Sequence, residues 1–337
     1  MPLPKCPRKL GIVGAGGWGT ALAVRAASAG FDVLLWCYEA DVANEIAHNR
    51  TNSRYLPDVT IPSSVRPITD FKPLEECAYI LLVVPSKAVR HVALKLCSDF
   101  DTTNVHFISC TKGIDFESGK VMSEVWREIL KTPNVSVLSG PNIAPEVARG
   151  APAAAVLGFE DENLLQKIQA ELHLPAFRIY TSSDVKGIQL GGALKNIYAI
   201  AAGCVDGFKL GDNAKAALIT RSLAEMMRLG TALGGRRETF HGLSGIGDLI
   251  VTCFSSFSRN RTFGERLGKG ETPHQILASM HNIAEGVPTT KAAFQLARKF
   301  GIETPVLDGI HSVLYSGKSP KEIMQALLER TPKPENL

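Results

Sequence analysis

One lysine and one asparagine lie side by side within a helical stretch that is otherwise small and apolar. The stretch runs from Gln189 to Gly203, and Lys195 and Asn196 are the pair. Burial in such a helix lowers the pKa of a lysine, which suits a general base working near neutral pH. A lysine can also extend its alkyl stem and keep its ammonium in water. We interpret Lys195 as a candidate acid-base group, with the solvated side chain as the alternative.

A carboxylate that could pair with a lysine occurs in Gly245-Ile-Gly-Asp248-Leu, again within an apolar stretch. A buried carboxylate requires a cationic partner, and either Lys195 or Lys112 could supply it. Lys112 precedes a glycine directly after an apolar run, so we expect it at the carboxyl end of a strand. The alternatives are that Asp248 caps a turn and that Lys112 is an ordinary exposed lysine.

A polar run, Ser258-Arg259-Asn260, precedes a helical pattern over 261–267. A hydroxyl, a guanidinium and an amide next to the free N–H groups of a helix start can bind an anion such as a phosphate. A polar loop with an ordinary helix cap is the alternative. The run therefore indicates an anion site without establishing one.

The Gly14-Ala-Gly16-Gly-Trp-Gly19 turn has the spacing and the context of a dinucleotide-binding loop. An apolar strand precedes it and a helical pattern follows it, as the fingerprint requires. Gly14 permits the tight turn, Gly16 the approach of the pyrophosphate, and Gly19 close packing of helix on strand. After the second strand comes Cys37-Tyr38-Glu39, where Glu39 could bind the adenosine ribose or could be a surface residue. The choice between NAD and NADP therefore stays open.

The elements expected around these residues are those of a Rossmann-type, doubly wound α/β sheet followed by an all-α domain. Short apolar strands alternate with helices in the first half, and helices alone follow residue 184. We expect a dinucleotide-binding domain over 1–184 and a helical catalytic domain over 185–337. The expected strands are 10–13, 33–36, 79–84, 105–109, 135–138, 153–157 and 177–180. The expected helices are 20–29, 41–48, 87–96, 120–130, 161–172, 185–204, 213–233, 261–267, 289–300, 306–315 and 320–328.

Composition excludes several classes of protein. The net charge of +4 is dispersed over 337 residues, which disfavours a nucleic-acid-binding surface. Seven cysteines without a CxxC pair predict buried thiols rather than disulfides or a metal site. The N-terminal residues lack the apolar core of a signal peptide, and we expect no membrane span. These features predict a cytoplasmic protein.

Together, the motifs resemble the bacterial type of the NAD(P)-dependent glycerol-3-phosphate dehydrogenase family. The resemblance extends in order over about residues 9–317. It is carried most specifically by Gly-Gly-Ala-Leu-Lys195-Asn, Gly-Ile-Gly-Asp248-Leu and Ser258-Arg-Asn-Arg, with Val83-Val-Pro-Ser, Thr111-Lys-Gly, Ser139-Gly-Pro, Ala284-Glu-Gly and Leu314-Tyr-Ser-Gly in support.

The resemblance implies reversible hydride transfer between NAD(P)H and dihydroxyacetone phosphate, giving sn-glycerol 3-phosphate for glycerophospholipids. Lys195 would be the proton acceptor and donor, with Lys112 and Asp248 also catalytic. The implied substrate-binding residues are Lys112, Gly140, Asn142, Lys195, Asn196, Asp248, Ser258, Arg259 and Asn260. The implied cofactor-binding residues are Gly14, Gly16, Gly17, Trp18, Gly19, Tyr38, Pro85, Lys112, Ala144, Arg259, Ile283 and Glu285.

The chain departs from the family pattern at two places. Asn142-Ile143 follows Gly140-Pro141 where a hydroxyl residue and Phe are usual, and Cys37-Tyr38 stands where a small and a basic residue are frequent. The alternative functions are another lysine-dependent hydroxyacid dehydrogenase and a non-catalytic dinucleotide-sensing regulator. The helical half could also supply a homodimer interface.

Overall fold

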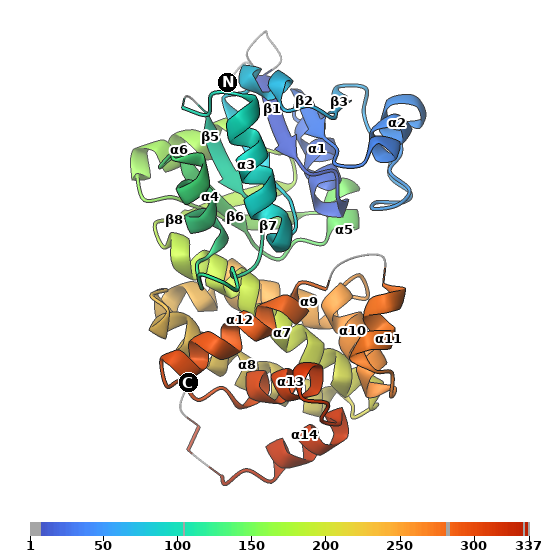
Figure 1. The fold of residues 1–337 in the computed structure, drawn as a ribbon, viewed down its shortest axis with the longest axis vertical. Helices are drawn as coiled ribbons and strands as arrows, with labels where there is room; N and C mark the ends of the chain where they lie inside the picture. The colour runs from blue at the N-terminus through green and yellow to red at the C-terminus, as the bar shows by residue number, and fades with distance from the viewer. Residues whose placement is uncertain (1–7, 104, 281–283, 333, 336–337) are drawn as a thin grey trace. The chain divides into compact units, whose positions relative to one another are not determined.

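The computed structural model describes residues 8–103, 105–280, 284–332 and 334–335. Its contacts divide the chain into two compact units. The first comprises residues up to 111 together with 122–185, and the second comprises 112–121 together with 186–337. The segment 112–121 thus packs within the second unit, although the boundary expected at residue 184 places it in the first domain. Figure 1 shows the chain coloured from blue to red along its length.

The first unit is built on an eight-stranded sheet in the order β3-β2-β1-β4-β5-β6-β7-β8. Neighbouring strands are parallel except β6 and β7, which pair antiparallel. The chain winds outward in both directions from β1 and β4, so the switch in strand order lies between them. The strands are β1 (Arg8–Val13), β2 (Phe31–Trp36), β3 (Val65–Ile68), β4 (Tyr79–Leu82), β5 (His106–Ser109), β6 (Val135–Ser139), β7 (Ala153–Gly158) and β8 (Phe177–Ser182).

Helices pack on both faces of this sheet, because successive side chains of a strand point to opposite faces. Leu34 and Leu35 of β2 are both fully buried, in two different apolar clusters. The predicted doubly wound α/β class is therefore confirmed. The helices of this unit are α1 (Gly17–Ser28), α2 (Ala40–Asn49), α3 (Val89–Asp99), α4 (Met122–Leu130), α5 (Ala144–Ala148) and α6 (Glu162–Glu171), with short 3₁₀ turns at Lys72–Glu76 and Ser86–Ala88.

After residue 185, the described part of the second unit is helical, as predicted. A 3₁₀ turn at Arg237–His241 and a π-type turn at Leu243–Gly247 join two long helices to the shorter ones. The helices are α7 (Val185–Gly207), α8 (Asp212–Ala232), α9 (Asp248–Phe254), α10 (Arg259–Gly268), α11 (Pro273–Ser279), α12 (Gly286–Lys299), α13 (Pro305–Tyr315) and α14 (Pro320–Leu328).

Helix α7 is the core of the second unit. Among the described residues it is the one helix long and apolar enough to cross a membrane, yet 94% of its most apolar window is buried inside the protein. Its glycines allow other backbone segments to approach closely. A side chain at Gly191 would place its Cβ 2.5 Å from the carbonyl oxygen of Ser244, and one at Gly203 would lie 2.0 Å from that of Arg261. The cost of glycine in a helix is thus offset by packing.

Candidate active site

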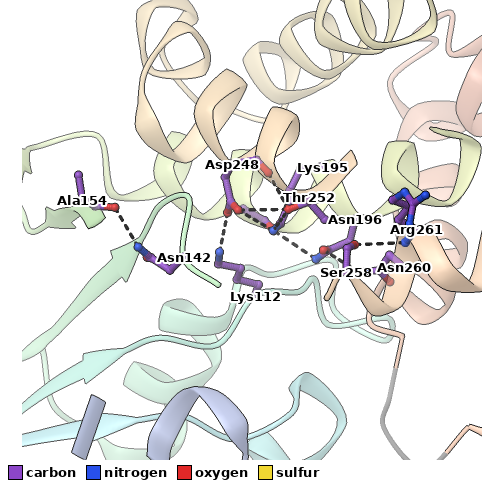
Figure 2. Close-up of polar contacts among 11 residues, drawn as sticks. Lys112, Asn142, Ala154, Lys195, Asn196, Asp248, Thr252, Ser258, Asn260 and Arg261 are labelled. Carbon is purple, nitrogen blue, oxygen red and sulfur yellow. Dashed lines mark hydrogen bonds and ion pairs between the residues drawn. The ribbon is translucent and has the colours of Figure 1, made fainter. Parts of the chain in front are cut away.

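Lys195 lies on α7 with its side chain turned into the second unit. The residue is 6% exposed, so its ammonium does not extend into solvent. The Nζ atom donates hydrogen bonds to Oδ1 of Asp248 at 2.6 Å and to the hydroxyl of Thr252 at 2.5 Å (Figure 2). Apolar side chains of the same helix, which form the unit's core, keep water away from this charge. Lys195 is thus buried, as its candidate acid-base role requires, and the alternative of a solvated side chain does not hold.

Asp248 is the first residue of α9 and has no exposed surface. Its Oδ2 atom accepts a hydrogen bond from Nζ of Lys112 at 2.5 Å, while Oδ1 accepts the one from Lys195. The carboxylate therefore bridges two lysines rather than choosing one. It makes no capping hydrogen bond to its own helix, whose N-cap is Gly247.

Burial sets the acid-base behaviour of Lys195. Loss of solvation lowers the pKa of its ammonium from 10.5 to about 8, and the positive charge of Lys112 acts in the same direction. The negative charge of Asp248 and its hydrogen bond oppose this fall. A group whose pKa lies this close to neutrality can both donate and accept a proton at physiological pH.

Thr252 is a member of this cluster that the sequence interpretation missed. Its hydroxyl donates to the backbone carbonyl of Asp248 at 2.6 Å and accepts the hydrogen bond from Lys195. Residues four apart lie on one face of a helix, so the Asp248–Thr252 spacing on α9 was the available signal. The threonine hydroxyl therefore helps to orient the Lys195 ammonium and adds no charge beside it.

Asn196, next to Lys195 on α7, belongs to a chain of buried amides. Its Oδ1 accepts from Nδ2 of Asn260 at 2.8 Å, and Oδ1 of Asn260 accepts from the backbone N–H of Gly286 at 2.9 Å. Its own amide nitrogen donates to the carbonyl of Gly192 at 3.3 Å. An amide nitrogen has two N–H donors, so Asn196 keeps one donor for a ligand. The chain ties α7, α10 and α12 together and sets the orientation of that amide.

The Ser258-Arg259-Asn260 run begins α10. The hydroxyl of Ser258 accepts from the N–H of Arg261 at 3.2 Å, so this serine is the helix cap that the alternative interpretation proposed. Arg261 is bound through Nε to Asp206 at 2.6 Å. Arg259, in contrast, is exposed at the first position of the helix. Arg259 is therefore the guanidinium of this run that solvent and ligands can reach.

The Gly14–Gly19 turn of the first unit has the shape that a pyrophosphate requires. Gly14 has a φ of 116°, and a Cβ on Gly19 would lie 1.8 Å from the carbonyl oxygen of Gly14, so both positions are needed for folding. A Cβ on Gly16 would meet nothing within 4 Å. No side chain caps α1, which leaves its N-terminus for an anion. Packing therefore does not explain the glycine at position 16, and the open turn with its uncapped helix fits a dinucleotide.

The other predicted residues of the first unit lie around strand ends. Trp18 packs against Phe177, with 6.1 Å between ring centroids, and Tyr38 is largely exposed after β2. Asn142 uses its amide N–H to bind the carbonyl of Ala154 on β7 at 3.0 Å. Gly140 is needed for the same approach, since its Cβ would lie 2.8 Å from that carbonyl. The remaining three are Gly17 at the start of α1, Pro85 after β4 and Ala144 at the start of α5.

Two predicted cofactor contacts precede α12 in the sequence. Glu285 is the N-cap residue of that helix. Ile283 lies outside the described residues.

The structure brings Lys112, Lys195 and Asp248 into one hydrogen-bonded group. It brings Asn196 and Asn260 into another. The binding roles of all these residues stay predictions.

Comparisons with known proteins agree on one family. Residues 9–165 match the model described as NAD-dependent glycerol-3-phosphate dehydrogenase N-terminus, and residues 184–325 match the corresponding C-terminus. Glycerol-3-phosphate dehydrogenase [NAD(P)+] of Streptomyces griseus is 43% identical over 98% of both chains, and that of Koribacter versatilis is 44% identical over 96% of this chain and 97% of its own. The crystal structure of glycerol-3-phosphate dehydrogenase from Coxiella burnetii superposes with a TM-score of 0.91, at 39% identity, over 96% of this chain and 99% of its own.

Proposed function

Because the chain belongs to the NAD-dependent glycerol-3-phosphate dehydrogenase family, we propose that it interconverts dihydroxyacetone phosphate and sn-glycerol 3-phosphate with NAD(P)H. The observation that carries the proposal is the buried Lys195, hydrogen-bonded to Asp248 and tuned toward neutrality. The product would supply the backbone of glycerophospholipids. Small soluble metabolites and a dinucleotide are then the ligands that the chain must bind.

The first unit would hold the dinucleotide, which when bound supplies or accepts a hydride at its nicotinamide. Gly16 lets the backbone approach the pyrophosphate, and the uncapped N-terminus of α1 offers N–H groups and a positive dipole end to it. Tyr38, Pro85 and Ala144 lie at strand or helix ends where further contacts with the dinucleotide are expected.

Lys195 would move the proton. As hydride adds to C2 of the ketone, the electron pair of the C=O π bond moves onto the oxygen, and that oxygen takes a proton from Nζ of Lys195. The lysine is left as a neutral amine. In the reverse direction the amine removes the hydroxyl proton as hydride departs from C2. The pKa of about 8 allows both steps near neutral pH.

Two neighbouring groups would stabilise the negative charge that develops on the C2 oxygen. Lys112 carries a positive charge and is positioned by the same carboxylate that positions Lys195. Asn196 has an amide N–H donor beyond the one used within its helix. Donors fixed in advance stabilise a transition state more effectively than water, which must reorganise.

The phosphate of the substrate would bind at the start of α10. Arg259 is exposed there and can form a forked pair with phosphate oxygens. Ser258 and Asn260 are occupied by the helix cap and by the amide chain, so we assign them to holding Arg259 and Asn196 in place. Anchoring the phosphate would fix C2 against the catalytic lysine.

The test follows the absorbance of reduced nicotinamide with a panel of substrates. Dihydroxyacetone phosphate should be reduced with NADH or NADPH, whereas dihydroxyacetone and a non-phosphorylated keto acid should be poor substrates. Turnover of the keto acid, with none of the phosphate ester, would instead support a hydroxyacid dehydrogenase. Binding of the dinucleotide without turnover of any substrate would support the regulator.

We also propose a cytoplasmic location and a homodimer through the helical unit. Cys37, Cys77, Cys97, Cys204 and Cys253 are free thiols, which suits a reducing compartment. Size-exclusion chromatography with light scattering would test the dimer, and a monomeric mass would reject it.

A further inference from the structure

The end of β2 lies directly against the dinucleotide turn. The N–H of Gly14 donates to the carbonyl oxygen of Trp36, the last residue of β2, at 3.1 Å. In this class of fold the residues that follow the second strand meet the adenosine ribose, where an acidic side chain binds the 2′-hydroxyl and a basic one accommodates a 2′-phosphate. The side chains at 37–39 therefore bear on the choice between NADH and NADPH.

Of these three residues, Glu39 is the one with a charge. Cys37 is 1% exposed and its thiol points back to the carbonyl of Leu35, at 3.6 Å. Tyr38 is 72% exposed and carries no charge to hold a phosphate. Glu39 is partly buried at the N-cap of α2. The strand end thus presents an acid and no base.

The Glu39 carboxylate is fixed from the side of the dinucleotide turn. The hydroxyl of Tyr55 donates to Oε1 of Glu39 at 2.7 Å. The backbone oxygen of the same tyrosine lies 2.8 Å from where a Cβ on Gly17 would be, so Tyr55 connects the turn to the carboxylate. The Oε2 atom of Glu39 has no hydrogen-bond partner among the residues that the structure describes. It is an acceptor left for a ribose hydroxyl.

Two arginines lie near this carboxylate, and each has another partner in the structure. Arg54 lies next to Tyr55, and its guanidinium is 3.4 Å from Oδ2 of Asp41. Arg50 donates hydrogen bonds to the backbone carbonyls of Ile61 and Val65. The two negative charges of Glu39 and Asp41 therefore exceed the one positive charge of the exposed Arg54. A bound 2′-phosphate would add about two more negative charges beside them.

We propose that Glu39, held by Tyr55, makes NADH the preferred dinucleotide of this enzyme, by accepting a hydrogen bond from the adenosine ribose and repelling the 2′-phosphate of NADPH. The inference rests on the proposed function, because it presumes that a nicotinamide dinucleotide is the cofactor. It goes beyond the comparisons, because the family models are described as NAD-dependent while the relatives are named for NAD(P)+, which leaves the preference open.

The test measures dissociation constants of NADH and NADPH by calorimetry, without substrate, for the wild type and two variants. Glu39→Gln keeps the size of the side chain and removes its charge. Asp32→Asn is the matched control, because Asp32 is the second residue of β2 and so lies near the opposite end of the same strand. The wild type should bind NADH more tightly by about tenfold or more, and Glu39→Gln should reduce that ratio by about tenfold, the scale of one unfavourable charge pair near a surface.

Asp32→Asn should keep the wild-type ratio, and all three proteins should unfold at the same temperature. Wild-type protein that binds NADPH as tightly as NADH would overturn the inference, as would an unchanged ratio in Glu39→Gln. Either result would leave the proposed function intact if dihydroxyacetone phosphate is still reduced. Failure to bind either dinucleotide would overturn both.

Discussion

Asp248→Asn removes the negative charge that Lys112 and Lys195 share and keeps the shape of the side chain. In the wild type, burial lowers the pKa of Lys195 and Asp248 limits the fall, so that the value stays at about 8. An opposite charge at hydrogen-bonding distance raises the pKa of a lysine by about 1 to 3 units. Without it, and with Lys112 still repelling, the pKa of Lys195 should drop to about 5 to 7.

The assay is the pH dependence of kcat for reduction of dihydroxyacetone phosphate. Reduction requires the protonated lysine, so the rate should fall as pH rises through the pKa of Lys195, near pH 8 in the wild type. In Asp248→Asn this alkaline limb should move down by about 1 to 3 pH units. The oxidation of glycerol 3-phosphate requires the neutral amine, so its acidic limb should move in the same direction.

Asp206→Asn is the matched control for loss of a carboxylate shared by two cations. Asp206 accepts from Lys215 at 2.9 Å and from Arg261 at 2.6 Å, in the same unit, and it has no hydrogen bond to Lys195. Both variants should lose stability, because removing one partner of a buried ion pair leaves a charge uncompensated. Asp248→Asn alone should move the pH limb. A limb that stays at the wild-type position in Asp248→Asn would refute this account of the lysine.

Two further predictions concern stability and the dinucleotide turn. Burial raises the pKa of Glu225, which accepts the N–H groups of Val306 and Leu307, to about 7. Because the folded pKa lies above the unfolded one, its stabilising contribution is complete below about pH 4.5 and is lost as pH rises through 7. Urea unfolding should show about 3 kcal/mol of pH-dependent stability that Glu225→Gln lacks, and parallel curves would contradict this. Gly16→Ala should fold with an unchanged melting temperature, because a Cβ at this position meets no other atom. It should bind NADH at least about tenfold more weakly, since the methyl group would occupy the space through which the pyrophosphate approaches the backbone. Wild-type affinity for NADH would contradict the assignment of the turn.

Much of the fold follows from local sequence patterns. Apolar runs rich in β-branched residues predicted the central strands, because parallel strands covered on both faces must be apolar throughout. The edge strand β3 escaped prediction, since it has four residues and contains Pro67, which is tolerated at a sheet edge. Helix α5 has five residues, too few to show a helical period. The packing of 112–121 with the second unit depends on tertiary contacts that no local pattern reports.

The sequence predicted which residues form the site more completely than which of them pair with one another. A lysine and an aspartate in apolar surroundings had to find partners, which indicated Lys195 and Asp248. That one carboxylate bridges both lysines could not be predicted, because the partners are separated by 53 and 136 residues in sequence. The Asn196–Asn260–Gly286 chain was missed for the same reason. Thr252 had a helical spacing signal, but an isolated threonine four residues after an aspartate is too common to interpret.

The most direct test of the proposed chemistry replaces Lys195 by methionine, which keeps the apolar stem and leaves Asp248 paired with Lys112. Turnover of dihydroxyacetone phosphate is measured under saturating NADH, and the dissociation constant of NADH is measured on the same protein. Turnover should fall by about 10² to 10⁴ or more, the usual contribution of a positioned acid, while NADH binding stays within about twofold of the wild type. Turnover at the wild-type rate in this variant would contradict the role of Lys195 as proton donor.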